Sequence, residues 1–136
     1  MPPTIKPYVL PAGTGVPGFG AEVKASGAAT GGMLTVIESR TVGGAPRHIH
    51  TREDEYFYVL EGTITVEIGG EHFEVGKGGF VFLPRGIPHS WDTLGEATLL
   101  MITTPPMLEV FLAEYHAAAS VERDQVAAKY GVTFLK

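Results

Sequence analysis

Residues that form turns recur at short intervals through the first hundred positions of this chain. Eighteen glycines and ten prolines occur among its 136 residues, and they fall between runs rich in β-branched and aromatic residues. The spacing of these runs, roughly 8–12 residues, is typical of an all-β sandwich or barrel. We expect strands at residues 32–39, 56–60, 63–68, 72–75, 80–83 and 97–103.

The clearest of these runs predicts a β-hairpin. Residues 63–68 alternate polar and apolar side chains, Gly69 and Gly70 follow as a turn, and residues 71–75 continue the pattern. Such alternation places one face of a strand pair in the core. The side chains expected to point inward are Ile64, Val66, Ile68, Phe73 and Val75.

One domain is expected to occupy the whole of residues 1–136, because the length and the 44% hydrophobic content suit a single core. Residues 1–31 are rich in glycine, alanine and proline and predict an irregular arm, with a short edge strand near residues 19–23. The barrel is expected over residues 32–104. The arm and the open barrel edges favour a homodimer, in which the arm covers an edge or a neighbouring subunit.

Beyond Pro105 and Pro106 the apolar residues change to helical spacing. This spacing predicts a short helical segment over residues 105–131. One helix is expected to run to about His116, and a second, capped by Ser120, is expected to end at Gly131. The VTFLK sequence that follows is expected to return as a strand or a tail.

Charge and composition exclude several classes of function. The net charge is −5 and the ten basic residues are scattered, so neither nucleic acid nor an anionic membrane is an expected partner. No cysteine is present, which excludes disulfides and thiol chemistry. The N-terminal sequence lacks the apolar stretch of a signal peptide, and no apolar run reaches membrane-spanning length. We therefore expect a cytoplasmic protein.

Three histidines and one carboxylate suggest a metal site. His48 and His50 lie two apart on a predicted strand, so their rings project from the same face. Glu55 opens the next strand, and His89 follows a Pro-Arg-Gly-Ile-Pro turn. Three imidazoles and one carboxylate form a site suited to a first-row divalent metal.

Other acidic and histidine residues compete for these roles. Glu53 and Asp54 are rivals of Glu55, but Glu55 is the one that leaves six residues before Gly62, so we interpret the two rivals as a solvated acidic turn. His72 and His116 are expected to be ordinary surface histidines.

The spacing of these residues resembles the two motifs of the cupin superfamily. His48, His50, Glu55 and Gly62 match the first motif, and Gly78, Pro84, Gly86 and His89 match the second. The resemblance covers about residues 30–104 and implies a small double-stranded β-helix, or jelly-roll, barrel with one metal bound by His48, His50, Glu55 and His89. Val42 replaces the first glycine of the first motif, and Thr93 replaces the last asparagine of the second.

The aromatic residues beside these ligands predict an apolar pocket. Phe57 shares strand parity with Glu55, and Trp91 shares it with His89, so both are expected to line this pocket. Four protein ligands would leave about two open positions on the metal, with a local charge of about +1 that favours an enolate or phenolate oxygen.

Within the superfamily, the sequence HIHTREDEYFYVLEG and the KYGVTF segment resemble small single-barrel proteins related to quercetin dioxygenase. The resemblance implies a dioxygenase that acts with molecular oxygen on a small planar enol or phenol, with iron, nickel, manganese, cobalt, copper or zinc as the metal. Glu55 would then act as both ligand and catalytic base. Two alternatives stay open: a metal- or ligand-binding sensor without turnover, and a metal-dependent isomerase or cyclase.

Overall fold

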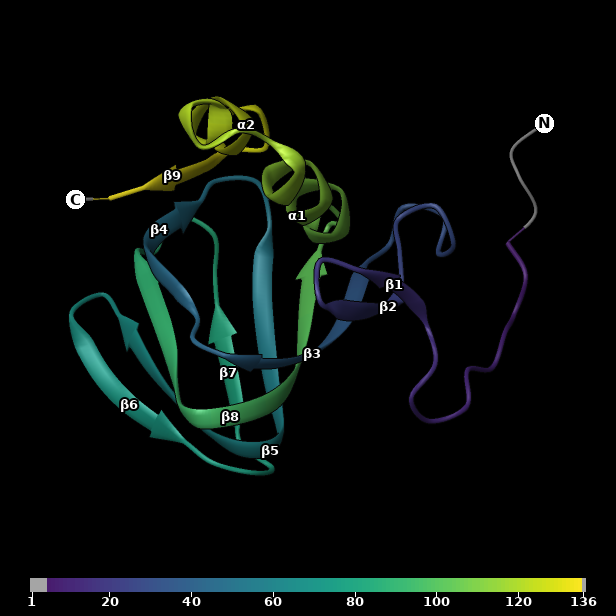
Figure 1. Ribbon diagram of the computed structural model, residues 1–136, viewed down its shortest axis with the longest axis horizontal. Coiled ribbons are helices and arrows are strands. Elements are labelled where there is room, and N and C mark those ends of the chain that lie inside the picture. Colours follow the sequence, from purple (N-terminus) through teal and green to yellow (C-terminus); the bar gives the residue numbers. More distant parts are fainter. Residues whose placement is uncertain (1–4, 136) are drawn as a thin grey trace.

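The computed structural model describes residues 5–135, and a barrel of two sheet layers dominates it (Figure 1). Nine strands form one continuous antiparallel sheet that folds over on itself. Its two longest strands, β5 (Asp54–Ile68) and β8 (His89–Thr104), bend and take part in both layers. This architecture confirms the predicted jelly-roll barrel.

Each layer combines parts of the two long strands with shorter neighbours. The first layer contains β1 (Val16–Gly18), β2 (Ala21–Ala25), β3 (Thr35–Val42) and β7 (Phe80–Leu83), joined by the end of β8 and the start of β5. The second contains β9 (Val132–Phe134), β4 (Ala45–His50) and β6 (Glu71–Val75), joined by the start of β8 and the end of β5.

The strand β5 joins two runs that the sequence pattern separates. Its ladder with β8 shifts register on both sides of Glu61, where the chain bulges next to Gly62. Gly62 has a φ of +79°, and a Cβ there would lie 2.5 Å from the carbonyl oxygen of Glu96. Only glycine allows this close approach, so the strand bends here and continues.

The predicted hairpin is present as β5 and β6, with Val66 opposite Phe73. Ile64 and Val66 are buried as expected, whereas Ile68 and Val75 are half-buried. Phe73 lies on the same face as Val66, as predicted, but it is not buried: 46% of its surface is exposed. Among the described residues β6 pairs with β5 alone, so it is an edge strand, and the Phe73 ring stays partly open to solvent.

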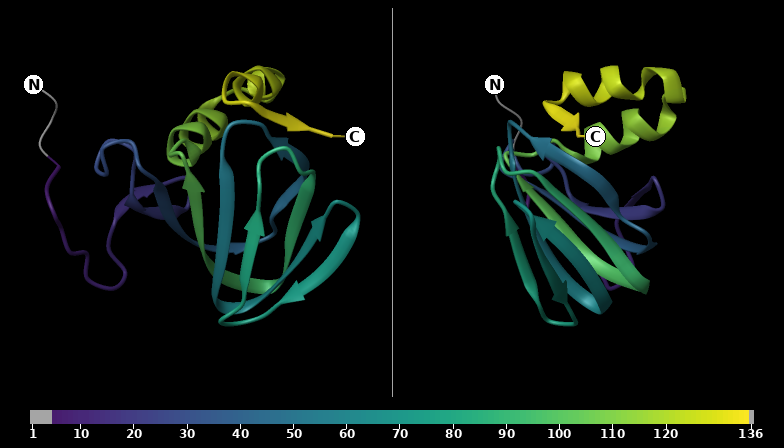
Figure 2. Two further views of the ribbon diagram at one scale, coloured as in Figure 1. Left: turned by 180° about the vertical axis from the view of Figure 1, so that it is seen from behind. Right: turned by 90° about the vertical axis from the view of Figure 1, so that its left-hand side faces the viewer.

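The C-terminal segment covers the mouth of the barrel (Figure 2). It consists of α1 (Leu108–Ala117), the short 3-10 helix η1 (Ser120–Glu122), α2 (Arg123–Lys129) and β9. Ser120 is not the N-cap that we expected: Ala119 precedes the 3-10 turn, and no side chain caps it. Neither α-helix within residues 5–135 has the length and apolarity that a membrane span requires.

Two apolar clusters stabilise the molecule. The first, which we call the barrel core, lies between the layers and contains Phe57, Val59, Ile64, Val66, Val81, Leu83, Ala97 and Leu99. The second, which we call the cap cluster, joins β3 to the C-terminal segment and contains Ile37, Leu108, Phe111, Ala127 and Val132.

The N-terminal arm contributes β1 and β2, and its earlier residues run outside the barrel (Figure 1). The β2 strand occupies residues 21–25, close to the predicted edge strand at 19–23. Before β1, the Tyr8 hydroxyl donates a 2.6 Å hydrogen bond to the carbonyl of Lys24, while Val9 is 90% exposed.

Candidate metal centre

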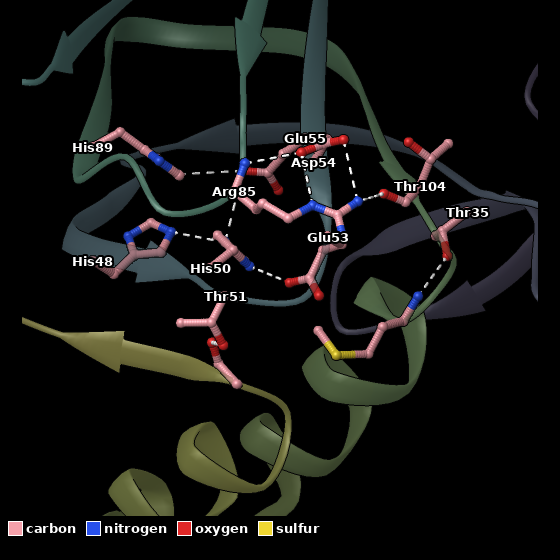
Figure 3. Close-up of polar contacts among 12 residues, drawn as sticks. Thr35, His48, His50, Thr51, Glu53, Asp54, Glu55, Arg85, His89 and Thr104 are labelled. Carbon is pink, nitrogen blue, oxygen red and sulfur yellow. Dashed lines mark hydrogen bonds and ion pairs between the residues drawn. The ribbon is translucent and has the colours of Figure 1, made fainter.

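The four residues expected to bind a metal come together in the mouth of the barrel (Figure 3). His48 and His50 lie on β4, Glu55 is the second residue of β5, and His89 is the first residue of β8. Direct pairing of His48 with His89 in the β4–β8 ladder brings the two segments together. One potential ligand atom from each of the four residues lies within 4.8 Å of the others, and all four side chains are buried.

The three imidazole rings turn the same nitrogen away from the centre of the cluster, although the plane of the His48 ring lies at 70° to that of His50 and at 65° to that of His89. The Nδ1 atoms point outward: that of His48 lies 2.6 Å from the Pro46 carbonyl, that of His89 lies 3.3 Å from the Ile87 carbonyl, and that of His50 contacts Glu53. An oxygen acceptor at Nδ1 keeps the proton there and leaves the lone pair on Nε2.

The Nε2 atoms face one another and Glu55. The Nε2 atoms of His48 and His50 are 3.1 Å apart, and Oε1 of Glu55 lies 3.8 Å from Nε2 of His50 and 3.4 Å from that of His89. Among the described residues, the buried Nε2 of His89 has no hydrogen-bond partner. Burial of a ring nitrogen without a hydrogen-bond partner costs free energy. A cation at the centre of the cluster would bind the lone pair of this nitrogen. The donor set therefore fits a divalent metal.

Burial and charge set the protonation of this cluster. Burial, together with the neighbouring His89, lowers the pKa of His48 to about 4, which leaves the ring neutral at pH 7. Burial alone would raise the pKa of Glu55, but contact with His89 and the three nearby imidazoles lower it below its ordinary value. For His50, burial alone would lower the pKa, but the hydrogen bond with Glu53 and the nearby carboxylates raise it.

The acidic turn predicted at residues 53–54 is wrong for Glu53. This side chain is 1% exposed, and its Oε1 accepts the hydrogen bond from Nδ1 of His50. Asp54 points the other way and pairs with Arg85, whose Nε lies 3.1 Å from its Oδ1. The signal that sequence reasoning missed is the separation of three residues between His50 and Glu53, which lets a carboxylate fold back onto the ring.

One departure from the family motifs, Thr93, contacts Gly43, the residue that follows the other departure, Val42. The hydroxyl of Thr93, at the position of the motif asparagine, accepts a 2.8 Å hydrogen bond from the backbone N–H of Gly43. Next to it, a Cβ on Gly44 would lie 2.1 Å from the Trp91 carbonyl oxygen. Glycine at position 44 therefore lets the loop that enters β4 pack against β8.

A cavity of about 300 Å³ borders the candidate metal centre, with three of the four candidate ligands among its lining residues. His48, His50 and Glu55 form its polar end. Its other walls come from three parts of the chain: β2 and the residue Phe19 before it; β3, β8 and the loop before β4; and the C-terminal segment. Their lining side chains include Phe19, Ala21, Ile37, Ser39, Thr41, Trp91, Met101, Leu108, Phe111, Leu112, Tyr115, His116, Val132 and Phe134.

The two residues predicted to line the pocket, Phe57 and Trp91, have different positions. Trp91 lines the cavity, but Phe57 is not among the lining residues. Phe57 is fully buried in the barrel core and packs edge-on against Trp91, with ring centroids 5.3 Å apart. Strand parity alone cannot separate these roles, since it gives the side of the sheet but not the depth in the barrel.

The two remaining histidines also differ. His72 is exposed on β6, as expected. His116 is exposed too, but it lines the outer part of the cavity and stacks on Phe19, with ring centroids 6.3 Å apart. His116 is therefore a surface histidine, as expected, that also borders the cavity.

Comparison with known proteins relates this barrel to one family. The model of the cupin domain matches residues 36–105, which run from β3 through β8. Quercetin 2,3-dioxygenase of Bacillus subtilis is 32% identical over 110 residues, which are 76% of this chain and 33% of that protein. Tetracenomycin polyketide synthase protein TcmJ of Streptomyces glaucescens is 31% identical over 67 residues, 49% of this chain and 45% of that protein.

A solved structure gives the same architecture. KdgF from Halomonas sp. superposes with a TM-score of 0.59 at 20% identity, covering 66% of this chain and 81% of that chain. At this identity the similarity supports the fold, and the present chain spans only about a third to a half of the curated relatives it matches. The matched domain, the barrel topology and the buried histidine and glutamate cluster agree, and this chain belongs to the cupin family.

Proposed function

We propose that this protein is a metal-dependent dioxygenase acting on a small planar enol or phenol. The observation that carries the proposal is the buried cluster of His48, His50, Glu55 and His89, three members of which line a mostly apolar cavity. The similarity to quercetin 2,3-dioxygenase, although it covers a third of that protein, supports the same class of reaction.

The cavity favours a compact and largely apolar substrate. A volume of about 300 Å³ lies at the small end of ligand pockets. None of the described residues that line it is lysine or arginine, which disfavours phosphorylated or multiply anionic substrates. The side chains of Trp91, Ile37 and Phe111 provide apolar walls against which a flat ring can pack.

The residues of the site have different roles in this reaction. His48, His50 and His89 would hold a metal through Nε2, and Glu55 would complete the set with a carboxylate oxygen. A divalent metal supplies a Lewis acid for the substrate hydroxyl oxygen. Glu55 accepts the proton of that hydroxyl, for which it must come within hydrogen-bond reach of the bound substrate. The C-terminal segment covers the mouth of the barrel and forms one wall of the cavity.

Metal analysis provides the first test. Protein purified without chelator is expected to contain one iron, nickel, manganese, cobalt, copper or zinc ion per chain. His48→Ala, His50→Ala and His89→Ala are each expected to lose most of this metal while keeping the barrel, because the barrel core lies elsewhere. Full metal content in all three variants would contradict the assignment.

Oxygen uptake provides the second test. The metal-loaded protein is screened in an oxygen electrode against flavonols, β-diketones and enediols. Metal-saturated Glu55→Gln is expected to turn over at least ~10²-fold more slowly, because it lacks the proton acceptor. Asp54→Asn is the matched control, since Asp54 faces Arg85 and should leave turnover unchanged.

Equal turnover by metal-saturated Glu55→Gln and the wild type would contradict the base role of Glu55. Absence of oxygen uptake with all three substrate classes would contradict the dioxygenase. Substrate conversion under anaerobic conditions would indicate an isomerase or cyclase, and tight binding without any conversion would indicate a sensor.

A further inference from the structure

A row of aromatic rings leads along the cavity from the candidate metal centre. It begins at the candidate ligand His48, whose ring centroid lies 5.6 Å from that of Phe134. The centroid of Phe134 lies 5.8 Å from that of Tyr115, which lies 5.9 Å from that of His116. The last ring is Phe19, which stacks on His116 at 6.3 Å. All five side chains line the cavity, so the row connects the metal centre with the rings of His116 and Phe19.

The last two rings, which we call the outer pair, come from segments outside the matched cupin domain. Phe19 precedes the matched residues 36–105, and His116 follows them. Phe19 belongs to the hairpin of β1 and β2, whose tip approaches α1 and its residue His116 (Figures 1 and 2). The metal end of the cavity therefore comes from the family barrel, whereas the outer pair comes from the segments on either side of it.

The backbone conformation of Phe19 is unfavourable for a phenylalanine. Because Gly18 pairs with Ala21, the two residues between them form the turn of the hairpin. These are Phe19 and Gly20, with φ angles of +41° and +77°. Such turns favour asparagine followed by glycine, because bulky side chains rarely adopt positive φ. Where a conformation of this kind persists, it often marks a functional position.

Packing of the hairpin does not by itself require an aromatic ring in this turn. Ala21 and Val23 of the same hairpin already pack against the cap cluster. Phe19 also contacts this cluster, but its side chain is only half-buried, and His116 is exposed. The outer pair therefore lines the cavity with flat apolar surface that the protein leaves partly uncovered.

We propose that the outer pair packs against the part of a planar substrate that lies farthest from the metal, and so selects substrates with more than one ring. This inference rests on the proposed function, in which the enol or phenol oxygen binds at the metal end. A single ring held there leaves the outer pair free. A further ring in the same plane extends along the aromatic row and packs against Phe19 and His116. The outer pair thus determines specificity and takes no part in the chemistry.

Two probes with the same metal-binding group test the proposal. Maltol and 3-hydroxyflavone share a hydroxypyranone group, which 3-hydroxyflavone extends with one fused and one linked benzene ring. Calorimetric titration of the metal-loaded protein under nitrogen measures both affinities without turnover. The wild type is expected to bind 3-hydroxyflavone at least ~10-fold more tightly than maltol. Equal affinities, or no binding of 3-hydroxyflavone, would overturn the proposal.

Removal of the Phe19 ring is expected to affect one probe only. Phe19→Asn introduces a residue that this turn favours, so the hairpin is kept. It is expected to weaken binding of 3-hydroxyflavone ~5–20-fold and to leave that of maltol unchanged. Val16→Asn is the control, because Val16 lies on the same hairpin, is 67% exposed and is not among the lining residues. An unchanged affinity of Phe19→Asn for 3-hydroxyflavone, or an equal loss for both probes, would overturn the proposal.

Two variants of His116 test whether its ring acts by packing. His116→Ala is expected to weaken binding of 3-hydroxyflavone ~5–20-fold, with maltol unaffected. His116→Phe keeps an aromatic ring and is expected to stay within about twofold of the wild type. Equal losses in the two variants would overturn the packing role.

A measurement on the wild type covers the case in which a variant fails to fold. In the zinc-loaded protein, 3-hydroxyflavone is expected to shift the NMR signals of the Phe19 and His116 rings. Its benzene protons are expected to show nuclear Overhauser effects to these rings. Maltol is expected to leave the same signals in place. Signals of the outer pair that respond to neither probe, or to both alike, would overturn the proposal.

The outcomes also separate this inference from the proposed function. Binding of 3-hydroxyflavone through the outer pair without oxygen uptake would contradict the dioxygenase and support the substrate class. Oxygen uptake with flavonols, while Phe19→Asn and His116→Ala bind 3-hydroxyflavone as the wild type does, would overturn the role of the outer pair and support the reaction.

Discussion

The barrel core and the cap cluster consist of the same kinds of side chains but have different structural roles. All members of the barrel core lie between residues 57 and 99, within the matched cupin domain. The cap cluster takes four of its five buried residues from positions 108–132, beyond that domain. The barrel core holds two sheet layers together, whereas the cap cluster borders the cavity. The comparison separates residues that maintain the fold from residues that shape the site.

The largest expected effect comes from removing one phenylalanine from each cluster. Phe57→Ala is expected to lower the free energy of unfolding by about 3–5 kcal/mol, because it leaves a hole between packed layers. Phe111→Ala is expected to cost roughly half as much, since it borders an existing cavity and the cap can open locally. Urea denaturation measures both. Equal losses would mean that the two clusters form one cooperative unit.

The next largest effect is expected on metal affinity, at the site between the barrel core and the cap cluster. Glu53→Gln weakens the acceptor for Nδ1 of His50 and is expected to lower metal affinity ~10–100-fold. Asp54→Asn, one residue along and facing Arg85, is expected to leave metal affinity unchanged. Competition with a chromogenic chelator measures both variants. Equal metal affinities for Glu53→Gln and the wild type would show that Glu53 does not contribute to metal binding.

A smaller effect is expected on ligand binding alone. Leu112 is half-buried and lines the cavity, so Leu112→Ala is expected to weaken flavonol binding by about 1–2 kcal/mol, or ~5–30-fold. Metal content should not change. Val121→Ala is the control, because Val121 belongs to the same C-terminal segment but is 86% exposed. Calorimetric titration of the metal-loaded protein tests both, and an unchanged Leu112→Ala affinity would place the ligand elsewhere.

The smallest effect concerns the contact between the two α-helices. Hydrogen bonds from Tyr130 and Lys129 lower the pKa of the Glu114 carboxyl below its ordinary value. A lowered folded-state pKa stabilises the cap above the unfolded pKa of about 4.3, and this contribution is lost as the pH falls through the folded-state pKa. Amide exchange in α2, corrected for intrinsic rates, should therefore increase on acidification below about pH 4. Glu114→Gln should show little of this change.

The sequence alone predicted the barrel and the four ligand candidates, because both depend on local patterns. Alternation in residues 63–68 and the fixed spacing of His48, His50 and Glu55 are visible without any tertiary contact. The length of β5 was not predictable in the same way, since Glu61 and Gly62 look like a turn until Glu96 is brought beside them. The burial of Glu53 and the exposure of Phe73 were not predicted, because both depend on what the rest of the chain places over these side chains.

The pairing of β9 with β4 has a consequence for the order of assembly during synthesis. Val132 lies opposite His50, and Phe134 lies opposite His48, so β9 covers the free edge of the strand that carries two candidate ligands. The ribosome makes β9 after the other strands of the barrel, so the segments that carry the four candidate ligands emerge before it. We therefore expect the nascent barrel to pass through a stage in which all four ligands are present and β4 is still open. A metal ion that enters at this stage would be enclosed when β9 docks.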